Sequence, residues 1–304
     1  MDAIQTIKPK RYHWFFLHSA GLALSFLNKI RHSAVGYRTP RPFSVTATDR
    51  SVNYCLNVVM NWEEVLRSYT GRERPFGGRH VLEIGPGPDL GTGLVLLALG
   101  AKSYCAIDKN NLVSHTPEDF YKRLFEKIRS FPERENARKA FEEFREAGSE
   151  RFSYIYNPDF DLTSLQSRKY EILVTQAVLE HLDDMKKVFT TFRQKLSPDG
   201  LMIHEVDLST HTRMIKNWDP LNILRYPDTI YHTVRFDGSP NRLRMSDYVF
   251  ILNQLGYKNV KTLPIKILDL DYTRWVTKHL SHPFRDYSFS DLQVLSFYLL
   301  ASVN

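Results

Sequence analysis

A glycine-rich turn between a short apolar run and a helical one is the part of the sequence best suited to chemistry. It reads V-L-E-I-G-P-G-P-D-L-G-T-G over residues 81–93, and Gly85, Gly87 and Gly91 follow the spacing G-x-G-x-x-x-G. We expect a strand to end at Ile84 and a helix to begin near Gly91, so that backbone N–H groups and a helix N-terminus face a ligand. The dinucleotide-binding fingerprint G-x-G-x-x-G is missed by one residue, so the turn alone does not identify the ligand.

Two carboxylates beside this turn narrow the choice of ligand. Glu83 stands two residues before Gly85, where a negative charge would repel a pyrophosphate and suit a cation such as a sulfonium or an ammonium group. Asp108 ends the next apolar run, 23 residues after Gly85. A carboxylate at that strand tip can accept hydrogen bonds from both hydroxyls of a ribose. Both features favour a cationic ligand that contains a ribose over a dinucleotide.

Three later stretches extend the pattern. They are D-F-D-L-T-S-L at 159–165, T-Q-A-V-L-E-H-L at 175–182 and L-S-P-D-G-L at 196–201. With the glycine-rich turn they resemble, in the right order, the motifs of the class I S-adenosylmethionine-dependent methyltransferases. The resemblance covers about residues 80–206. One departure is Asp89, which stands where many members of that family have a third glycine.

The resemblance implies S-adenosylmethionine as the cofactor and assigns residues to each part of it. The alternative for the glycines is a turn of a βαβ protein that binds no cofactor. The residues so assigned are Asp108 for the ribose, Asp161 for the adenine amino group, Glu83 for the methionine end, Gly85 and Gly87 for close backbone approach, and Gln176 for the pocket of the methyl donor.

The elements that must position these residues alternate between strand-like and helical periodicity. From His80 onwards, short apolar runs are followed by turn or helix signals, which is the pattern of a parallel sheet covered by helices on both faces. We therefore expect an α/β fold, a doubly wound and mostly parallel sheet, which for the resembling family is the Rossmann-like methyltransferase fold. The strand-like runs are 80–84, 103–107, 170–175 and 201–206, with 260–268 and 294–303 closing the sheet.

We divide the chain into an N-terminal helical cap or arm, residues 1–78, and a methyltransferase domain, residues 79–304. The first segment contains two helical stretches separated by a break at Thr39-Pro40-Arg41-Pro42. Within the second, residues 110–150 predict a helical insertion whose apolar side chains recur at i, i+3, i+4 and i+7. Residues 210–245 lack a clear period and predict a substrate lid.

A hydroxyl acceptor would favour a base near the ends of the strand-like runs 170–175 and 201–206, because ligands bind at the carboxyl ends of the strands in open parallel sheets. The candidates are His211, Asp207 and His181. His204 lies within the run 201–206, and we expect its side chain to lie in the core. Glu180 and His181 are adjacent and could touch a metal, but Ala177 stands where a third ligand would help. We therefore predict no metal.

Absent motifs narrow the acceptor. At the end of the run 170–175 the chain reads T-Q-A-V and lacks the Asp/Asn-Pro-Pro-aromatic run common in enzymes that methylate base amino groups. This absence disfavours nucleic acid as the methyl acceptor. We predict methyl transfer to an oxygen or nitrogen of a small molecule, such as a sugar or a nucleotide sugar. Residues 239–248 also resemble a segment of methyltransferases from polysaccharide and small-molecule pathways. Arg242 and Arg244 in this segment either bind a carboxylate or phosphate of an anionic acceptor or are surface charges.

The basic charge of the chain is concentrated at its N-terminus. Residues 1–80 hold 12 Lys or Arg and 5 Asp or Glu, whereas the rest holds 29 of each. The apolar run Trp14–Leu27 is shorter than the roughly 20 residues that span a bilayer. Residues 8–31 therefore predict either a packed helix or a helix on a membrane surface.

The chain has two cysteines, Cys55 and Cys105, which excludes a disulfide framework and favours a reducing compartment. We therefore expect a cytoplasmic protein, located peripherally at the membrane if the N-terminal helix binds lipid.

Besides a small-molecule methyltransferase, three functions stay open from the sequence. They are methylation of a lipid or membrane-associated acceptor, methylation of nucleic acid held by the basic arm, and S-adenosylmethionine binding without turnover.

Overall fold

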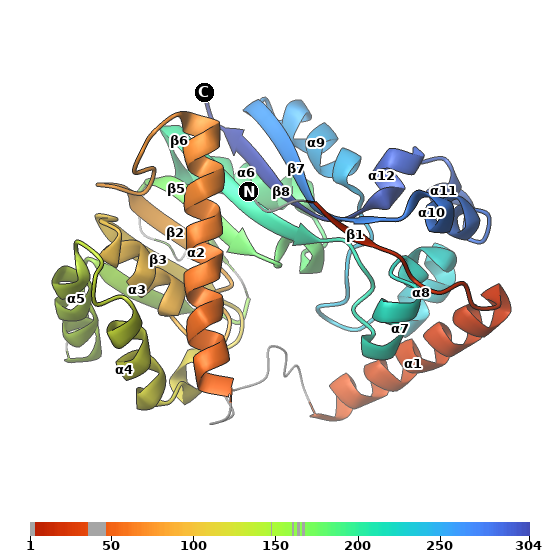
Figure 1. The fold of residues 1–304 in the computed structure, drawn as a ribbon, viewed down its shortest axis with the longest axis horizontal. Coiled ribbons are helices and arrows are strands. Elements are labelled where there is room, and N and C mark those ends of the chain that lie inside the picture. Colours follow the sequence, from red (N-terminus) through yellow and green to blue (C-terminus); the bar gives the residue numbers. More distant parts are fainter. Residues whose placement is uncertain (1–3, 36–46, 147, 160, 163–164, 166–167) are drawn as a thin grey trace.

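The computed structural model describes residues 4–35, 47–146, 148–159, 161–162, 165 and 168–304. Within these residues, an eight-stranded sheet with the order β1-β7-β8-β6-β5-β2-β3-β4 forms the centre of the molecule (Figure 1). The strands are β1 (Gln5–Ile7), β2 (His80–Ile84), β3 (Ser103–Asp108), β4 (Phe152–Tyr156), β5 (Tyr170–Gln176), β6 (Leu196–Asp207), β7 (Lys258–Leu268) and β8 (Val294–Ser302).

The strand order reverses between β2 and β5. From β2 the chain builds outward through β3 and β4, then crosses back to β5 and continues through β6 to the other edge. All pairings are parallel except those of β8, which runs antiparallel to both β6 and β7. The predicted doubly wound, mostly parallel sheet is thus confirmed. In such sheets ligands bind outside the carboxyl ends of the strands at the reversal point.

Helices cover both faces of the sheet, because successive side chains of each central strand point to opposite sides. Val81 of β2 joins the core beneath one set of helices, and Leu82 joins the core beneath the other. The first set is α2 (Thr48–Thr70), α3 (Gly91–Ala98), α4 (Glu118–Lys127) and α5 (Arg134–Glu146), and the second is α6 (Met185–Lys195) and α9 (Met245–Gln254). The apolar stripes of α4 and α5 face this core, as predicted.

Two strands at the edges of the sheet, β1 and β4, are absent from the sequence prediction. Phe152 alone is buried among the five residues of β4, and two of the three residues of β1 are exposed. An edge strand buries few side chains, so the apolar run that reveals a central strand is missing. The short pairing of β1 with β7 adds the beginning of the chain to the sheet.

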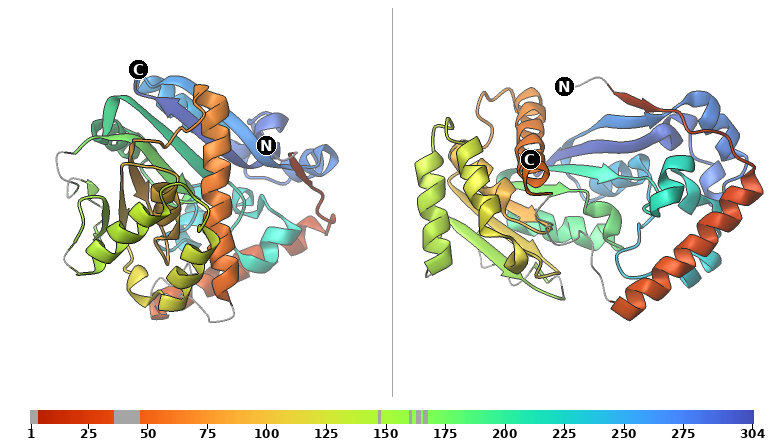
Figure 2. Two further views of the ribbon diagram at one scale, coloured as in Figure 1. Left: turned by 60° about the vertical axis from the view of Figure 1, so that its left-hand side comes forward. Right: turned by 60° about the horizontal axis from the view of Figure 1, so that its bottom comes forward.

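The N-terminal segment contains the two predicted helices, and they pack in different places. α1 (Trp14–Val35) lies on the outside of the molecule, away from α3, α4 and α5 (Figure 2). In contrast, α2 packs on α3, and its Trp62 and Leu66 are fully buried. The Pro-containing break at 39–42 lies outside the described residues, and the division at residues 78 and 79 stays a prediction.

Residues 210–245 contain short helices instead of irregular chain, and a buried polar network holds them. Asp219 and Arg225 form a fully buried ion pair with an Oδ2–Nε distance of 2.6 Å. Asn222 donates a hydrogen bond to the backbone oxygen of Leu17 in α1, so the segment is tied to that helix. The helices here are α7 (Arg213–Trp218), η5 (Asn222–Arg225) and α8 (Asp228–Val234), and α10 (Leu270–Thr277), α11 (His282–Arg285) and α12 (Phe289–Gln293) follow β7.

Candidate active site

The glycine-rich turn follows β2 directly and brings its backbone close to the end of β5. Gly85 and Gly87 have φ angles of 71° and 80°, in the left-handed region that side chains disfavour. A Cβ on Gly85 would lie 2.8 Å from Cγ2 of Val178, the second residue after β5. Any other residue at position 85 would therefore strain the turn and press against the next loop. The close approach of these glycines to a cofactor stays a prediction.

Asp108, the last residue of β3, holds its carboxylate at the mouth of this turn. Its Oδ2 accepts a hydrogen bond from the Gly87 N–H at 3.2 Å, and its Oδ1 accepts one from the Asn110 N–H at 2.8 Å. Burial raises the pKa of Asp108, and backbone N–H donors only partly offset this effect. Each oxygen keeps a second acceptor site, so an oriented carboxylate with spare acceptors fits the two hydroxyls of a ribose.

Glu83 supports the turn from within the sheet. Its Oε2 accepts hydrogen bonds from Thr92 Oγ1 of α3 and from Tyr104 OH of β3, both at 2.6 Å. The residue is 1% exposed, and burial raises its pKa to about 7 despite these two donors. One carboxylate oxygen is thus used to join β2, β3 and α3, a role that the sequence motif does not reveal. The contact of Glu83 with the methionine end of a cofactor stays a prediction.

Gln176, the last residue of β5, has one amide atom bonded and the other unsatisfied. Its Nε2 donates to Glu205 Oε2 of β6 at 2.6 Å. Its Oε1 is buried and has no hydrogen-bond partner among the described residues. Because an unpaired buried acceptor costs about 1–3 kcal/mol, a donor such as the ammonium group of a bound amino acid fits this position. Glu205, which the sequence analysis did not single out, orients the amide.

Asp161 lies in the loop after β4 and is exposed. Asn157 Nδ2 donates to its backbone oxygen at 3.2 Å. Residues 160 and 163–164 of the same stretch lie outside the described residues. The role of Asp161 beside an adenine amino group therefore stays a prediction.

Two of the three predicted catalytic residues lie together, beyond the end of β5. The rings of His181, in η4 (Leu179–His181), and of His211, in the loop after β6, have centroids 4.8 Å apart. Burial lowers the pKa of both imidazoles, that of His211 to about 4, so both are neutral at pH 7. Glu180 joins them: its Oε1 lies 3.9 Å from His211 Nε2. His211 is distant in sequence from the Glu-His pair, and the fold brings the three together.

Asp207, the third candidate, is already paired. Its Oδ2 lies 2.6 Å from Lys216 Nζ, and its Oδ1 accepts a hydrogen bond from the Ser209 N–H at 3.0 Å. Burial opposes its ionisation, but Lys216, His211 and Ser209 outweigh that effect and lower its pKa. Asp207 therefore stays ionised and is held toward Lys216.

His204 has the core position that was predicted for it. The side chain is fully buried, its Nδ1 lies 2.9 Å from Thr175 Oγ1, and its ring stacks on Phe192. Burial lowers its pKa to about 3, so the imidazole is neutral.

Arg242 and Arg244 serve the interior of the protein, so both interpretations of them from the sequence are wrong. The Arg242 guanidinium lies 4.1 Å from the ring centroid of Tyr231, pairs with Asp228 and donates to the Tyr226 carbonyl at 2.7 Å. Arg244 is 0% exposed and donates to backbone carbonyls of the segment 291–294 and of residue 208. Each guanidinium holds loops together instead of facing solvent or a ligand.

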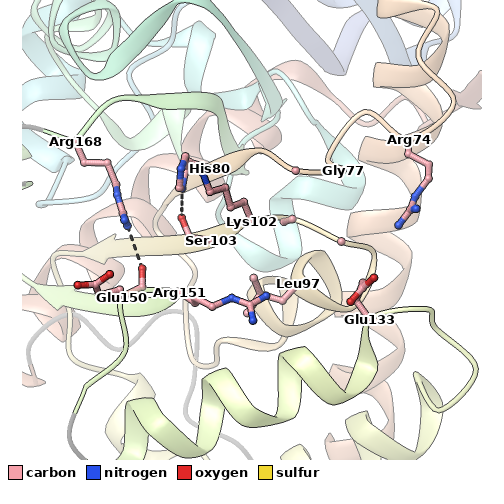
Figure 3. A pocket seen from close by; sticks show the side chains of 13 residues that line it. Arg74, Gly77, His80, Leu97, Lys102, Ser103, Glu133, Glu150, Arg151 and Arg168 are labelled. Carbon is pink, nitrogen blue, oxygen red and sulfur yellow. Dashed lines mark hydrogen bonds between the residues drawn. The ribbon is translucent and has the colours of Figure 1, made fainter.

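A broad hollow of about 720 Å³ lies at the opposite edge of the sheet (Figure 3). His80 and Ser103 in its wall begin β2 and β3, so the hollow is at the amino ends of the strands. Two of its cations are engaged by backbone: Arg74 donates to Leu99 O and Arg168 to Glu150 O, each at 3.0 Å. Ligands bind at the carboxyl ends of the strands in such sheets, so a hollow at the amino ends is not the ligand site defined by the glycine-rich turn.

The sheet order and the turn with Gly85 and Gly87 define an α/β protein of the Rossmann-like class, and the carboxylate of Asp108 lies at the carboxyl end of β3 beside this turn. A family model described as a methyltransferase domain matches residues 54–260. The chain belongs to this family. It is a class I S-adenosylmethionine-dependent methyltransferase, and S-adenosylmethionine is its cofactor.

Several solved structures are similar to this chain at low sequence identity. A CurJ carbon methyltransferase is 14% identical, over 95% of this chain and 68% of its own, with a TM-score of 0.48. A methyltransferase from Archaeoglobus fulgidus is 17% identical, over 80% and 94%, with a TM-score of 0.42. Phosphoethanolamine N-methyltransferase 2 of Haemonchus contortus, solved with S-adenosyl-L-methionine, is 12% identical over 96% and 60%, with a TM-score of 0.46. No curated protein matches the chain.

Replacing Asp108 with alanine removes the carboxylate placed for the ribose. We expect the variant to bind S-adenosylmethionine at least about tenfold more weakly, a loss of about 1.4 kcal/mol or more. Calorimetric titration measures this, with Asp199→Ala, an exposed carboxylate near the amino end of β6, as the control. Equal affinity of a folded Asp108→Ala variant and the wild type would contradict the assignment.

Glu83→Gln tests the buried carboxyl group. Because its pKa is about 7 in the folded chain against an ordinary 4.5, the folded state binds more protons between these values, and wild-type stability falls as the pH rises through them. Glutamine keeps an acceptor for Thr92 and Tyr104 but cannot ionise. We expect the variant to gain stability over the wild type between pH 5 and pH 8, by on the order of 1–3 kcal/mol. Urea unfolding at both pH values measures the gain, and a pH-independent difference would refute it.

Proposed function

We propose that the protein transfers the methyl group of S-adenosylmethionine to an oxygen or nitrogen of a small molecule that binds beside His181 and His211. One observation carries the proposal. Val178 contacts the glycine-rich turn at Gly85, and His181 follows three residues later with the His211 ring against it. The cofactor site and the histidine pair are therefore neighbours at the carboxyl ends of β2, β5 and β6.

A cavity of about 50 Å³ beside His211 supports a small acceptor. One wall comes from α1 through Ser25 and Asn28, and the other from residues 212–240, including Tyr231. A space of this size admits one end of a small molecule and is too small for a nucleic-acid strand. Nucleic acid is for this reason the less favoured acceptor.

The chemistry asked of the protein is alignment and proton removal, because the sulfonium already activates the methyl carbon. The methyl group passes from sulfur to the acceptor atom, and the acceptor proton passes to a base. His211 Nδ1 lies 2.9 Å from the Ser209 carbonyl and so carries the proton, which leaves Nε2 as an acceptor. With a pKa of about 4 it is a weak base, suited to an acceptor that becomes acidic only as the new bond forms.

Replacing His211 with alanine should lower kcat by roughly 10²- to 10⁴-fold and leave the affinity for S-adenosylmethionine nearly unchanged. The assay is methyl transfer across a panel of sugars, nucleotide sugars, amines and phospholipids, with affinity measured by calorimetry. His232→Ala, an exposed histidine in α8, is the matched control. Unaltered turnover would exclude His211, and cofactor binding without transfer to any acceptor would favour a non-catalytic binding protein.

The outer face of α1 supports a second proposal, that the protein docks on an anionic lipid surface and acts on a lipid or membrane-associated acceptor. Phe15, Phe26, Leu27 and Ile30 are 50–60% exposed, and Phe15, Phe26 and Ile30 share one side of the helix. Residues 3–48 contain seven Lys or Arg and no Asp or Glu. A basic helix with exposed aromatic side chains is typical of the membrane interface. No helix within the described residues is long and apolar enough to cross a membrane.

Co-sedimentation with vesicles tests this surface. We expect the wild type to bind vesicles of phosphatidylcholine and phosphatidylserine, and Phe26→Ser with Ile30→Ser to weaken binding at least about tenfold, because two apolar side chains no longer enter the lipid. Phe250→Ser, an equally exposed change on α9, is the control. Failure of the wild type to bind, or equal losses for the two surfaces, would rule out docking through α1.

A further inference from the structure

Glu180 is a buried carboxylate whose oxygens have no hydrogen-bond partner within the described part of the chain. The residue is 1% exposed, and neither Oε1 nor Oε2 has a partner among the described residues. A buried carboxylate is costly unless it is paired or binds a cation. The position therefore calls for a ligand that supplies positive charge.

Two imidazoles, those of His181 and His211, lie beside this carboxylate, and each has one unprotonated ring nitrogen. His181 Nδ1 lies 2.6 Å from the Gly238 carbonyl, and His211 Nδ1 lies 2.9 Å from the Ser209 carbonyl. A carbonyl only accepts hydrogen bonds, so each Nδ1 carries the proton and each Nε2 keeps its lone pair. Metal-binding histidines are commonly oriented in this way, with the second ring nitrogen donating to a carbonyl.

We propose that Glu180, His181 and His211 bind one divalent transition-metal ion. One ligand atom from each lies within 4.8 Å of the other two. Metal–ligand bonds of about 2.0–2.2 Å hold ligand atoms roughly 3.4 Å apart. Binding of the ion would therefore shorten the distances between the three ligand atoms by roughly 1 Å. Two imidazoles and one carboxylate suit Zn²⁺, Co²⁺, Ni²⁺ or Fe²⁺ better than Mg²⁺ or Ca²⁺.

This proposal reverses the sequence-based expectation of no metal, and the reason is tertiary. Ala177 does occupy the position near Glu180 and His181 where a third metal ligand would help. His211 supplies that third ligand instead, from the loop after β6. His211 also lines the cavity assigned to the acceptor, so an ion here would face the acceptor with an open coordination position. In that arrangement His211 is a ligand and not the base. This last point rests on the proposed function, whereas ion binding itself does not.

Titration of the metal-free full-length chain with Co²⁺ tests the site, because Co²⁺ reports its ligands by visible absorption. We expect one Co²⁺ per chain with the absorption of a site of low coordination number, and displacement by Zn²⁺. His211→Ala and Glu180→Gln should each weaken binding at least about tenfold, or about 1.4 kcal/mol. The exposed histidines give the matched controls His115→Ala and His232→Ala, which should bind as the wild type does.

Thermal unfolding separates a metal ligand from a structural residue. A bound ion raises the melting temperature of the wild type by mass action, and we expect this rise to vanish in Glu180→Gln. Without metal, Glu180→Gln should be at least as stable as the wild type, since it loses an unpaired buried carboxylate. If Glu180→Gln does not fold, the His211→Ala titration decides. Absence of saturable Co²⁺ binding by the folded wild type, or equal binding by His211→Ala, would overturn the proposal.

Failure of the metal site and failure of the proposed function can be told apart. For this, binding of S-adenosylhomocysteine is measured by calorimetry in the presence of a chelator. Cofactor binding and methyl transfer that persist in chelator, without Co²⁺ binding, would refute the metal site alone. Co²⁺ binding at the three residues without any methyl transfer would support the metal site and count against the proposed reaction.

Discussion

The parallel pairing of β2 with β3 on one side and β5 on the other is the constraint on which the site depends. It aligns the carboxyl ends of three strands, so Gly85, Asp108 and Gln176 meet at one edge although they are far apart in the sequence. The contact of Gly85 with Val178 then sets how closely two of the loops approach. The placement of the residues predicted to bind the cofactor thus follows from backbone hydrogen bonds of the sheet.

The buried carboxylates of this chain fall into two groups. Glu83 and Asp219 are matched, the first by hydroxyl donors of Thr92 and Tyr104 and the second by the guanidinium of Arg225. Such groups join elements, although for Glu83 the two hydroxyl donors offset only part of the desolvation. Glu180 is as deeply buried and has no such match, although two imidazoles stand near it. That difference marks the end of β5 as a place for a ligand, unlike the hollow at the opposite edge of the sheet.

The helix α1 has two surfaces with different surroundings. Its inner side meets η5, where Asn222 donates to Leu17 O, and it closes one wall of the cavity beside His211. Its outer side exposes aromatic and aliphatic side chains in a segment without acidic residues. The helix that lines the cavity proposed for the acceptor is therefore also the one whose outer side we propose for a lipid surface, so the two proposals concern one part of the molecule.

Local periodicity and short motifs encode the central strands, the glycine-rich turn and the family, so these could be predicted from the residues alone, together with an expected ribose-binding role for Asp108. The sequence did not reveal β1 and β4, since edge strands bury too few side chains to leave an apolar pattern. The interior positions of Arg242 and Arg244, and the place of His211 beside Glu180 and His181, became apparent only from the packing of the folded chain. Burial and proximity are properties of distant segments packed together, and no local spacing of residues contains them.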